Sequence, residues 1–154
     1  MGLDMYLSKE SYIGANYEHR EVKATIKITI EGVDVTINPN RLDTIIESVG
    51  YWRKANAIHK WFVDHCQDGD DDCRAAEVSR TQLQELLDTC VKVQANHSLA
   101  SELLPPQSGF FFGGVEVDDW YFEQITDTIK ILESVLSESE CASAYPIYKY
   151  TSSW

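Results

Sequence analysis

The alternation of side chains between residues 22 and 37 constrains the fold more than any other feature of this chain. Polar residues alternate there with apolar ones, whose first members are Ala24, Ile26, Ile28 and Ile30. The pair Glu31-Gly32 interrupts the pattern, and residues 33–37 then alternate again. A period of two is typical of a strand that buries one face. Residues 22–37 are therefore predicted to form a β-hairpin with one half-buried face.

A first helix is predicted to begin at Asn38-Pro39 and to run to about Cys66, with a bend near Gly50. Asparagine is favoured as an N-cap, and proline is favoured at the first helical position. Apolar residues recur through this segment at helical spacing, at Ile45, Val49, Trp52, Ala55 and Phe62.

Two further helices have clear starts. Ser79 and Gln82 have the spacing of a capping box, and an apolar stripe follows at Leu83, Leu86, Leu87, Cys90 and Val91. This helix must end before Pro105-Pro106. Asp118 or Asp119 then caps a third helix, whose stripe comprises Phe122, Ile125, Ile129, Leu132 and Val135 or Leu136.

The segments together predict an α+β fold. Residues 3–8 and 147–150 are expected to add a first and a last strand to the hairpin. We therefore predict a small, mostly antiparallel sheet with three helices packed on one face. The length of 154 residues suits a single domain over 1–154.

The net charge of −12 is unevenly distributed. Residues 1–60 hold eight Lys/Arg and eight Asp/Glu, whereas residues 61–154 hold five and seventeen. Such a chain is expected to be repelled by nucleic acids and anionic membranes. The acidic part can instead attract a basic partner or simply maintain solubility. The first seven residues lack the basic start of a signal peptide, so we expect an intracellular protein with four reduced cysteines.

No motif predicts a metal, a cofactor or a catalytic residue. The acidic loop at 68–72 resembles the start of a calcium-binding loop, but Cys73 stands where glycine is required. The cysteines and histidines lack the short paired spacings of structural zinc sites, and no P-loop or nucleophile elbow occurs. Glu116, Asp118 and Asp119 form a carboxylate cluster whose simplest role is helix capping.

Residues 51–61 are the first candidate site, because they combine basic and aromatic side chains in an acidic protein. On a continuous helix, Trp52, Asn56 and His59 would lie on one side and could converge on one ligand. Arg53 and Lys54 would hold an anion while an aromatic ring stacks on a base. The alternative is an amphipathic helix whose tryptophans are core residues.

Residues 107–114 are the second candidate site. Ser108 and three consecutive phenylalanines, including Phe110 and Phe112, are flanked by glycines. Glycine permits close approach of the backbone, so the segment could form the wall of a pocket or a subunit interface. The alternative is an internal strand with bulges.

Three motifs resemble a family of small bacteriophage and prophage proteins. They are the opening residues 1–7, the segment 50–63 and the segment 107–113. The resemblance runs from end to end and implies a phage-encoded accessory protein that acts in the bacterial cytoplasm. It brings no catalytic residues with it.

The leading functional hypothesis is a counter-defence protein that sequesters a small anionic nucleotide-like immune signal without catalysis, as a homo-oligomer. Its ligand site would comprise Trp52, Arg53, Lys54, Asn56, His59, Ser108, Phe110 and Phe112. One alternative is an acidic, DNA-mimic-like interaction protein that blocks a host nucleic-acid-acting or defence enzyme. Another is a hydrolase of the same nucleotides that uses His59 and a carboxylate.

Overall fold

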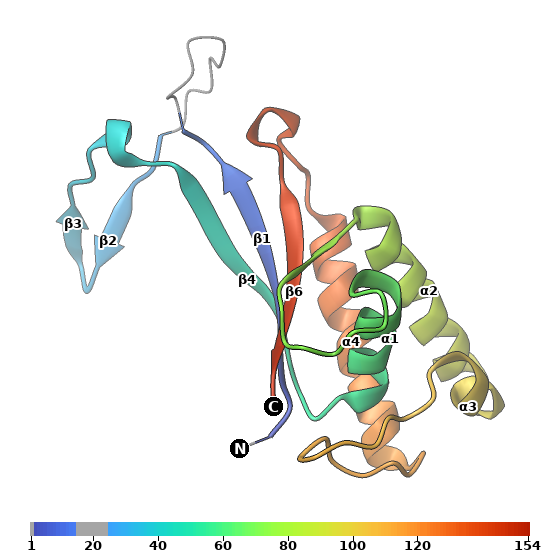
Figure 1. Cartoon of the computed structure of the whole chain (residues 1–154). Coiled ribbons are helices and arrows are strands. Elements are labelled where there is room, and N and C mark those ends of the chain that lie inside the picture. The colour runs from blue at the N-terminus through green and yellow to red at the C-terminus, as the bar shows by residue number, and fades with distance from the viewer. Residues whose placement is uncertain (1, 15–24) are drawn as a thin grey trace.

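The main sheet has four antiparallel strands in the order β4-β1-β6-β5, and helices cover one of its faces (Figure 1). The computed structural model describes residues 2–14 and 25–154. Its strands are β1 (Asp4–Tyr12), β4 (Thr44–Arg53), β5 (Ala76–Val78) and β6 (Ile147–Ser153), with a separate pair β2 (Ile28–Ile30) and β3 (Val33–Val35). The helices are α1 (Asn56–Cys66), α2 (Arg80–Ala95), α3 (Ala100–Leu103) and α4 (Asp119–Ser137).

The predicted α+β class with a mostly antiparallel sheet is confirmed. The structure adds the short helix α3 and the strand β5 to the predicted elements, along with single 3-10 turns at Pro39–Arg41, His97–Leu99 and Ala142–Ala144. Within the described ranges, no helix has the length and apolar character needed to cross a membrane.

The core lies between the covered face of the sheet and the helices. In β1 the side chains of Met5 and Leu7 point into this layer, whereas Tyr6 lies on the open face. From β6, Tyr148 and Tyr150 enter the same core. Alternate burial along these strands follows from the period of two, because successive side chains point to opposite faces.

The predicted stripes of α2 and α4 are largely confirmed. The buried residues are Leu83, Leu86, Leu87, Cys90 and Val93 in α2, and Tyr121, Ile125, Thr128, Leu132 and Val135 in α4. Val91, predicted to be buried, is exposed because it lies off the stripe that Val93 continues.

The N-caps predicted for α2 and α4 are also present. The Ser79 side chain accepts from the backbone N–H of Gln82, whose side chain in turn accepts from the backbone N–H of Ser79. Asp118 accepts from the N–H of Tyr121 and so begins α4.

The predicted helix from Asn38 to Cys66 is wrong in its first half. Asn38 caps only a 3-10 turn at Pro39–Arg41, and the chain then forms β4. Residues 44–49 are rich in β-branched side chains, which favour strands, and they pair with β1 from Tyr12↔Thr44 onward. A register shift after Leu7 leaves Val49 unpaired as a bulge, so the expected bend near Gly50 is an irregularity in a strand.

The hairpin is confirmed by β2 and β3, although residues 22–24 of the predicted segment lie outside the described part of the chain. Glu31 and Gly32 form its turn with φ of 50° and 81°, the positive values that a type I′ turn requires. The expectation of a half-buried face is wrong, because every residue of both strands is exposed.

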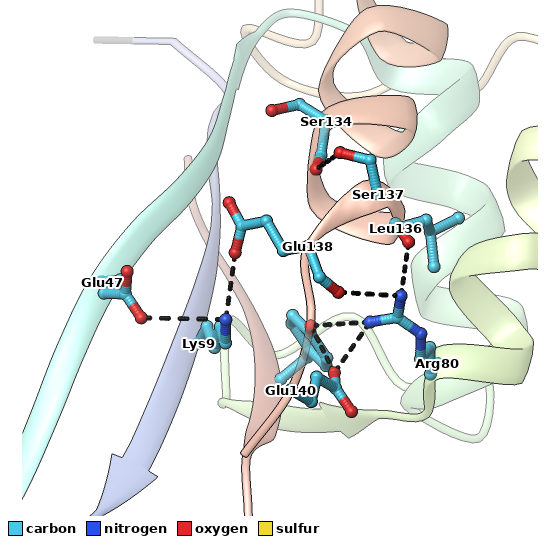
Figure 2. Close-up of polar contacts among 9 residues, drawn as sticks. Lys9, Glu47, Arg80, Ser134, Leu136, Ser137, Glu138 and Glu140 are labelled. Carbon is cyan, nitrogen blue, oxygen red and sulfur yellow. Dashed lines mark hydrogen bonds and ion pairs between the residues drawn. The ribbon is translucent and has the colours of Figure 1, made fainter.

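A cluster of charged side chains fixes the C-terminal end of α4 to the sheet and to α2 (Figure 2). Lys9 of β1 is buried and lies 3.0 Å from Glu138, with Glu47 at 4.0 Å on its other side. Arg80 donates to the carboxylate of Glu140 at 2.9 Å and to the carbonyl oxygen of Leu136. The guanidinium therefore satisfies a backbone acceptor that the end of a helix leaves unpaired.

Candidate ligand-binding groove

A surface groove lies where the end of β4 meets the first turns of α4. Its lining residues are Tyr51, Trp52, Arg53 and Lys54 on one side, and Trp120, Gln124 and Asp127 on the other. The groove has a volume of about 380 Å³. This volume is within the range of small-molecule sites.

The α4 wall presents an aromatic ring and an amide on one face of the helix. Trp120 and Gln124 are four residues apart and therefore lie one above the other. The Trp120 side chain is 56% exposed, which is unusual for an indole. Thr128 continues the row and accepts a hydrogen bond of 2.9 Å from Nε1 of Trp52. This bond connects α4, which forms this wall, to Trp52 of β4, which forms the floor of the groove.

Arg53, at the end of β4, has side-chain donors that could bind a ligand. It stands opposite Asp4 in the register of the sheet, and its Nε lies 3.9 Å from Oδ1 of that carboxylate. The same oxygen accepts a hydrogen bond of 2.6 Å from the hydroxyl of Tyr51, and this bond raises the pKa of Tyr51. Because the Arg53 side chain is 60% exposed and its ion pair is long, most of its donors face solvent.

Lys54 connects β4 to α1 in a strained backbone conformation. Its φ is 58°, in the left-handed region of backbone conformation that residues other than glycine rarely adopt. Its N–H donates to the carbonyl oxygen of Leu3 at 2.8 Å, which fixes the turn. The side chain forms no ion pair with any residue in 2–14 or 25–154. A strained backbone persists only where the surrounding structure holds it in place, and such residues are concentrated at functional sites.

A small cavity of about 20 Å³ adjoins the groove and shares Lys54, Trp120 and Gln124 with it. Asn56, Gly114 and Glu116 belong to the other lining residues. A cavity of this size holds about one water molecule. Together, the groove and the cavity bring polar groups from three segments of the chain to one place.

Asn56 holds the glycine- and phenylalanine-rich loop 107–114 in place. Its buried amide donates to the carbonyl oxygens of Phe112 at 3.2 Å and Gly114 at 2.8 Å. Its side-chain oxygen accepts from the N–H of Gln107 at 3.1 Å. All three contacts are made within the protein, so Asn56 positions this loop, whose last residue Gly114 lines the cavity beside the groove.

Loop 107–114 is an irregular turn, so the alternative prediction of an internal strand is wrong. Phe111 has a φ of 69°, and a Cβ on Gly109 would lie 2.5 Å from the ring of Phe112. Phe112 is buried against His59, whereas Ser108 is exposed and Phe110 is 80% exposed at the tip. Of these eight residues only Gly114 lines the cavity beside the groove, and none lines the groove itself.

His59 lies in the core, away from the groove. Its Nδ1 hydrogen-bonds with the hydroxyl of Tyr150 at 2.7 Å, and its Nε2 lies 2.9 Å from Oδ2 of Asp71. Nε1 of Trp154 donates to the other oxygen of Asp71 at 3.1 Å. His59 thus connects the acidic loop to β6, and both of its ring nitrogens have protein partners.

The predicted convergence of Trp52, Asn56 and His59 on one helix face is therefore wrong, because Trp52 belongs to β4 and all three are buried. The structure brings Arg53 and Lys54 together at the groove, with Trp52 in its floor and Asn56 behind it. Sequence reasoning missed Trp120 and Gln124. One signal could have found Trp120, since it is a tryptophan that lies off the apolar stripe of its helix.

The acidic loop and the cysteines show no geometry of a metal site. Arg74 forms ion pairs with Asp70 and Asp72 at 3.9 and 3.5 Å. Within the part of the chain that the structure describes, no group of three or more His, Cys, Asp or Glu side chains is arranged to hold a metal ion. All four cysteines are free.

No protein-family model matches the chain, and no curated protein or solved structure matches it significantly. The groove must therefore be interpreted from its own chemistry.

Proposed function

We propose that this protein binds a small anionic nucleotide-like ligand in the groove between β4 and α4 and sequesters it without changing it. The observation that carries this proposal is the presence of two available cations and an exposed indole in one groove of about 380 Å³. Guanidinium and ammonium groups bind phosphate oxygens, and a tryptophan face stacks on any base.

The two walls suggest one orientation for the ligand. Its phosphate would lie at Arg53 and Lys54, and its base would lie on Trp120, with the Gln124 amide as hydrogen-bond partner. Asp127 also lines the groove, and Lys130 lies 3.0 Å from its Oδ1. This pairing reduces repulsion of an anion and leaves a carboxylate oxygen to accept from a ribose hydroxyl or an exocyclic amine.

The chemistry of the lining favours binding over catalysis. The seven groove residues include no serine, cysteine or histidine. Of the lining residues that could act as acid or base, Asp127 is paired with Lys130, and the Tyr51 hydroxyl donates to Asp4. The hydrolase alternative relied on His59, which is fully buried and hydrogen-bonded on both ring nitrogens. A ligand in the groove cannot reach it.

The biological setting follows from the resemblance of residues 1–7, 50–63 and 107–113 to small phage proteins. A phage-encoded protein that sequesters a nucleotide signal would act against a host immune pathway in the bacterial cytoplasm. This setting is part of the proposal and rests on that resemblance together with the chemistry of the groove.

A second candidate function is supported by the outer face of α4. A hollow of about 560 Å³ there extends to Gln94 and His97 at the end of α2. Its lining includes four carboxylates and one lysine, namely Asp118, Asp119, Glu123, Asp127 and Lys130. Such a surface would attract a basic region of a host enzyme, as a DNA mimic does.

One experiment separates the candidates. The purified protein is incubated with a nucleotide extract from phage-challenged bacteria, washed and denatured, and the released compounds are identified by mass spectrometry. Intact released nucleotide supports sequestration, whereas altered nucleotide would support the hydrolase. If no nucleotide is retained, the groove proposal fails and the acidic surface becomes the better candidate.

Arg53→Ala tests the site itself. Loss of one arginine–phosphate interaction costs about 1.5–3 kcal/mol, which corresponds to roughly 10- to 150-fold weaker binding. Calorimetric titration with the retained nucleotide measures this change. Lys92→Ala is the matched control, since it removes one exposed positive charge from α2 outside the groove. Equal affinity of the Arg53 and Lys92 variants would place the ligand elsewhere.

A further inference from the structure

The hairpin β2–β3 has one wholly apolar face. Its cross-strand pairs are Ile28↔Val35 and Ile30↔Val33, so these four side chains project to the same side. Their exposed fractions are 38, 58, 66 and 39% for Ile28, Ile30, Val33 and Val35. The opposite face is polar, because Thr29 donates to Asp34 there at 2.9 Å.

The hairpin stands apart from the core. Figure 1 shows it beyond the edge of the main sheet, on the side away from the helices. Neither β2 nor β3 contributes a residue to the core cluster, and among the described elements the two strands pack mainly on each other. A lone two-stranded hairpin is marginally stable in water, and an exposed apolar face of this kind marks an interaction surface.

The charge distribution indicates which partner fits this surface. Described residues 25–42 carry Lys27 and Arg41 against Glu31 and Asp34, so this region is neutral in a chain with a net charge of −12. A strongly basic partner would be drawn to the acidic part of the chain. Two copies of this chain, in contrast, repel each other where their residues 61–154 face one another and can approach with little repulsion at the hairpin.

The shape of the face also suits self-association. An interface around a two-fold axis requires a surface that complements itself. The Ile/Val face contains no charge that would need an opposite charge on the partner. When a second copy faces the first in the opposite strand direction, its Ile30 and Val33 lie over Ile28 and Val35 of the first copy.

We propose that two copies of this protein form a symmetric dimer by packing the Ile28, Ile30, Val33 and Val35 faces of their hairpins together. This inference is independent of the proposed function, because no hairpin residue lines the groove. Four partly exposed Ile and Val side chains bury less than the roughly 800 Å² per partner of a standard interface, so we expect micromolar affinity.

The test is sedimentation equilibrium of the full chain from about 1 to about 200 µM, the range in which interfaces of micromolar affinity dissociate. The wild type should convert from monomer to dimer as concentration rises. Ile30→Asp should weaken dimerisation at least tenfold, because it buries two like charges near the two-fold axis. Ile30→Val should retain the dimer.

Two controls keep the result interpretable. Val91→Asp adds the same charge at an exposed apolar residue of α2 and should dimerise like the wild type. Circular dichroism and thermal melting should show that Ile30→Asp remains folded, since Ile30 is outside the core. A wild-type protein that is monomeric throughout the range, or an Ile30→Asp variant that dimerises as well as the wild type, would overturn the proposal.

Discussion

Lys54 is the residue that most directly links the backbone to the proposed function. It occupies a left-handed conformation with φ of 58°, which glycine adopts without strain, and it lines the groove beside Arg53. A strained lysine in this conformation costs about 1–2 kcal/mol relative to an ordinary one. A requirement for its ammonium group at this position would explain why the chain has a lysine there.

Lys54→Gly should therefore separate stability from binding. The substitution relieves the strain but adds about 0.5–1 kcal/mol of unfolded-state entropy, so the free energy of unfolding should stay constant or rise by up to about 1.5 kcal/mol. Affinity for the retained nucleotide should fall at least tenfold. Urea unfolding and calorimetric titration measure the two quantities. Lys54→Ala, which keeps the strain and loses the charge, should bind equally poorly. Full affinity in Lys54→Gly would remove Lys54 from the site.

Trp120 provides the second residue-scale prediction. Stacking on a base contributes about 1–3 kcal/mol, so Trp120→Ala should weaken binding by roughly 5- to 150-fold. Trp120→Phe keeps an aromatic face and should retain most of the affinity. Both variants should melt near the wild-type temperature, because the indole is more than half exposed. Calorimetric titration measures the change, and an alanine variant that binds as tightly as the wild type would contradict the stacking role.

At the scale of elements, the connection between α4 and β6 depends on ionised Glu140. It accepts 2.6 and 2.9 Å hydrogen bonds from the Tyr148 hydroxyl and from Arg80. These bonds lower the pKa of Glu140, the Tyr148 bond most strongly. Burial, followed by the bond to Glu140, raises the pKa of Tyr148 to about 12, so this hydroxyl remains a donor at neutral pH. Arg80 also donates to the carbonyl oxygens of Leu136 and Glu138 at the end of α4, so the same guanidinium stabilises the helix end and the connection to β6.

The lowered pKa of Glu140 predicts an acid-sensitive stability. Its contribution is present above the unfolded pKa of about 4.5 and is lost as pH falls through the lower folded value. The free energy of unfolding should therefore decline between about pH 5 and pH 3, and Glu140→Gln should be less stable at pH 7 with a shallower decline. Urea melts across this range measure both effects. Glu133→Gln neutralises an exposed carboxylate on α4 and should leave the profile unchanged. Parallel profiles for the wild type and Glu140→Gln would contradict this role.

At the scale of the whole molecule, the reactivity of the cysteine thiols measures how well the core is protected from solvent. Cys90 is fully buried, and burial raises its pKa to about 12, whereas Cys141 is exposed. The thiolate is the reactive form, so a buried thiol with a high pKa is inert until the chain opens.

Alkylation under native conditions should therefore modify Cys141 within minutes and leave Cys90 protected. In increasing urea, labelling of Cys90 should follow the global unfolding transition. Mass spectrometry of the digested protein measures both rates. Labelling of Cys90 as fast as Cys141 in native buffer would mean that α2 separates from the core without global unfolding.

The sequence determined those parts of the fold in which a local pattern and its burial agree. The stripes of α2 and α4, their caps at Ser79 and Asp118 and the turn at Glu31-Gly32 are examples. The caps and the turn form hydrogen bonds between residues a few positions apart, and the stripes recur at the period of the helix itself. Periodicity and capping therefore contain the necessary information.

Only the tertiary structure decided that residues 44–53 form a strand and which residues line the groove. Ile45, Val49 and Trp52 have helical spacing, but pairing with β1 makes this segment a strand. That choice separates Trp52 from the face of α1 that bears Asn56 and His59. It also places Lys54 beside Trp120 of α4. Contacts between such distant segments depend on which strand pairs form and which helix covers them, and no local period records these energies.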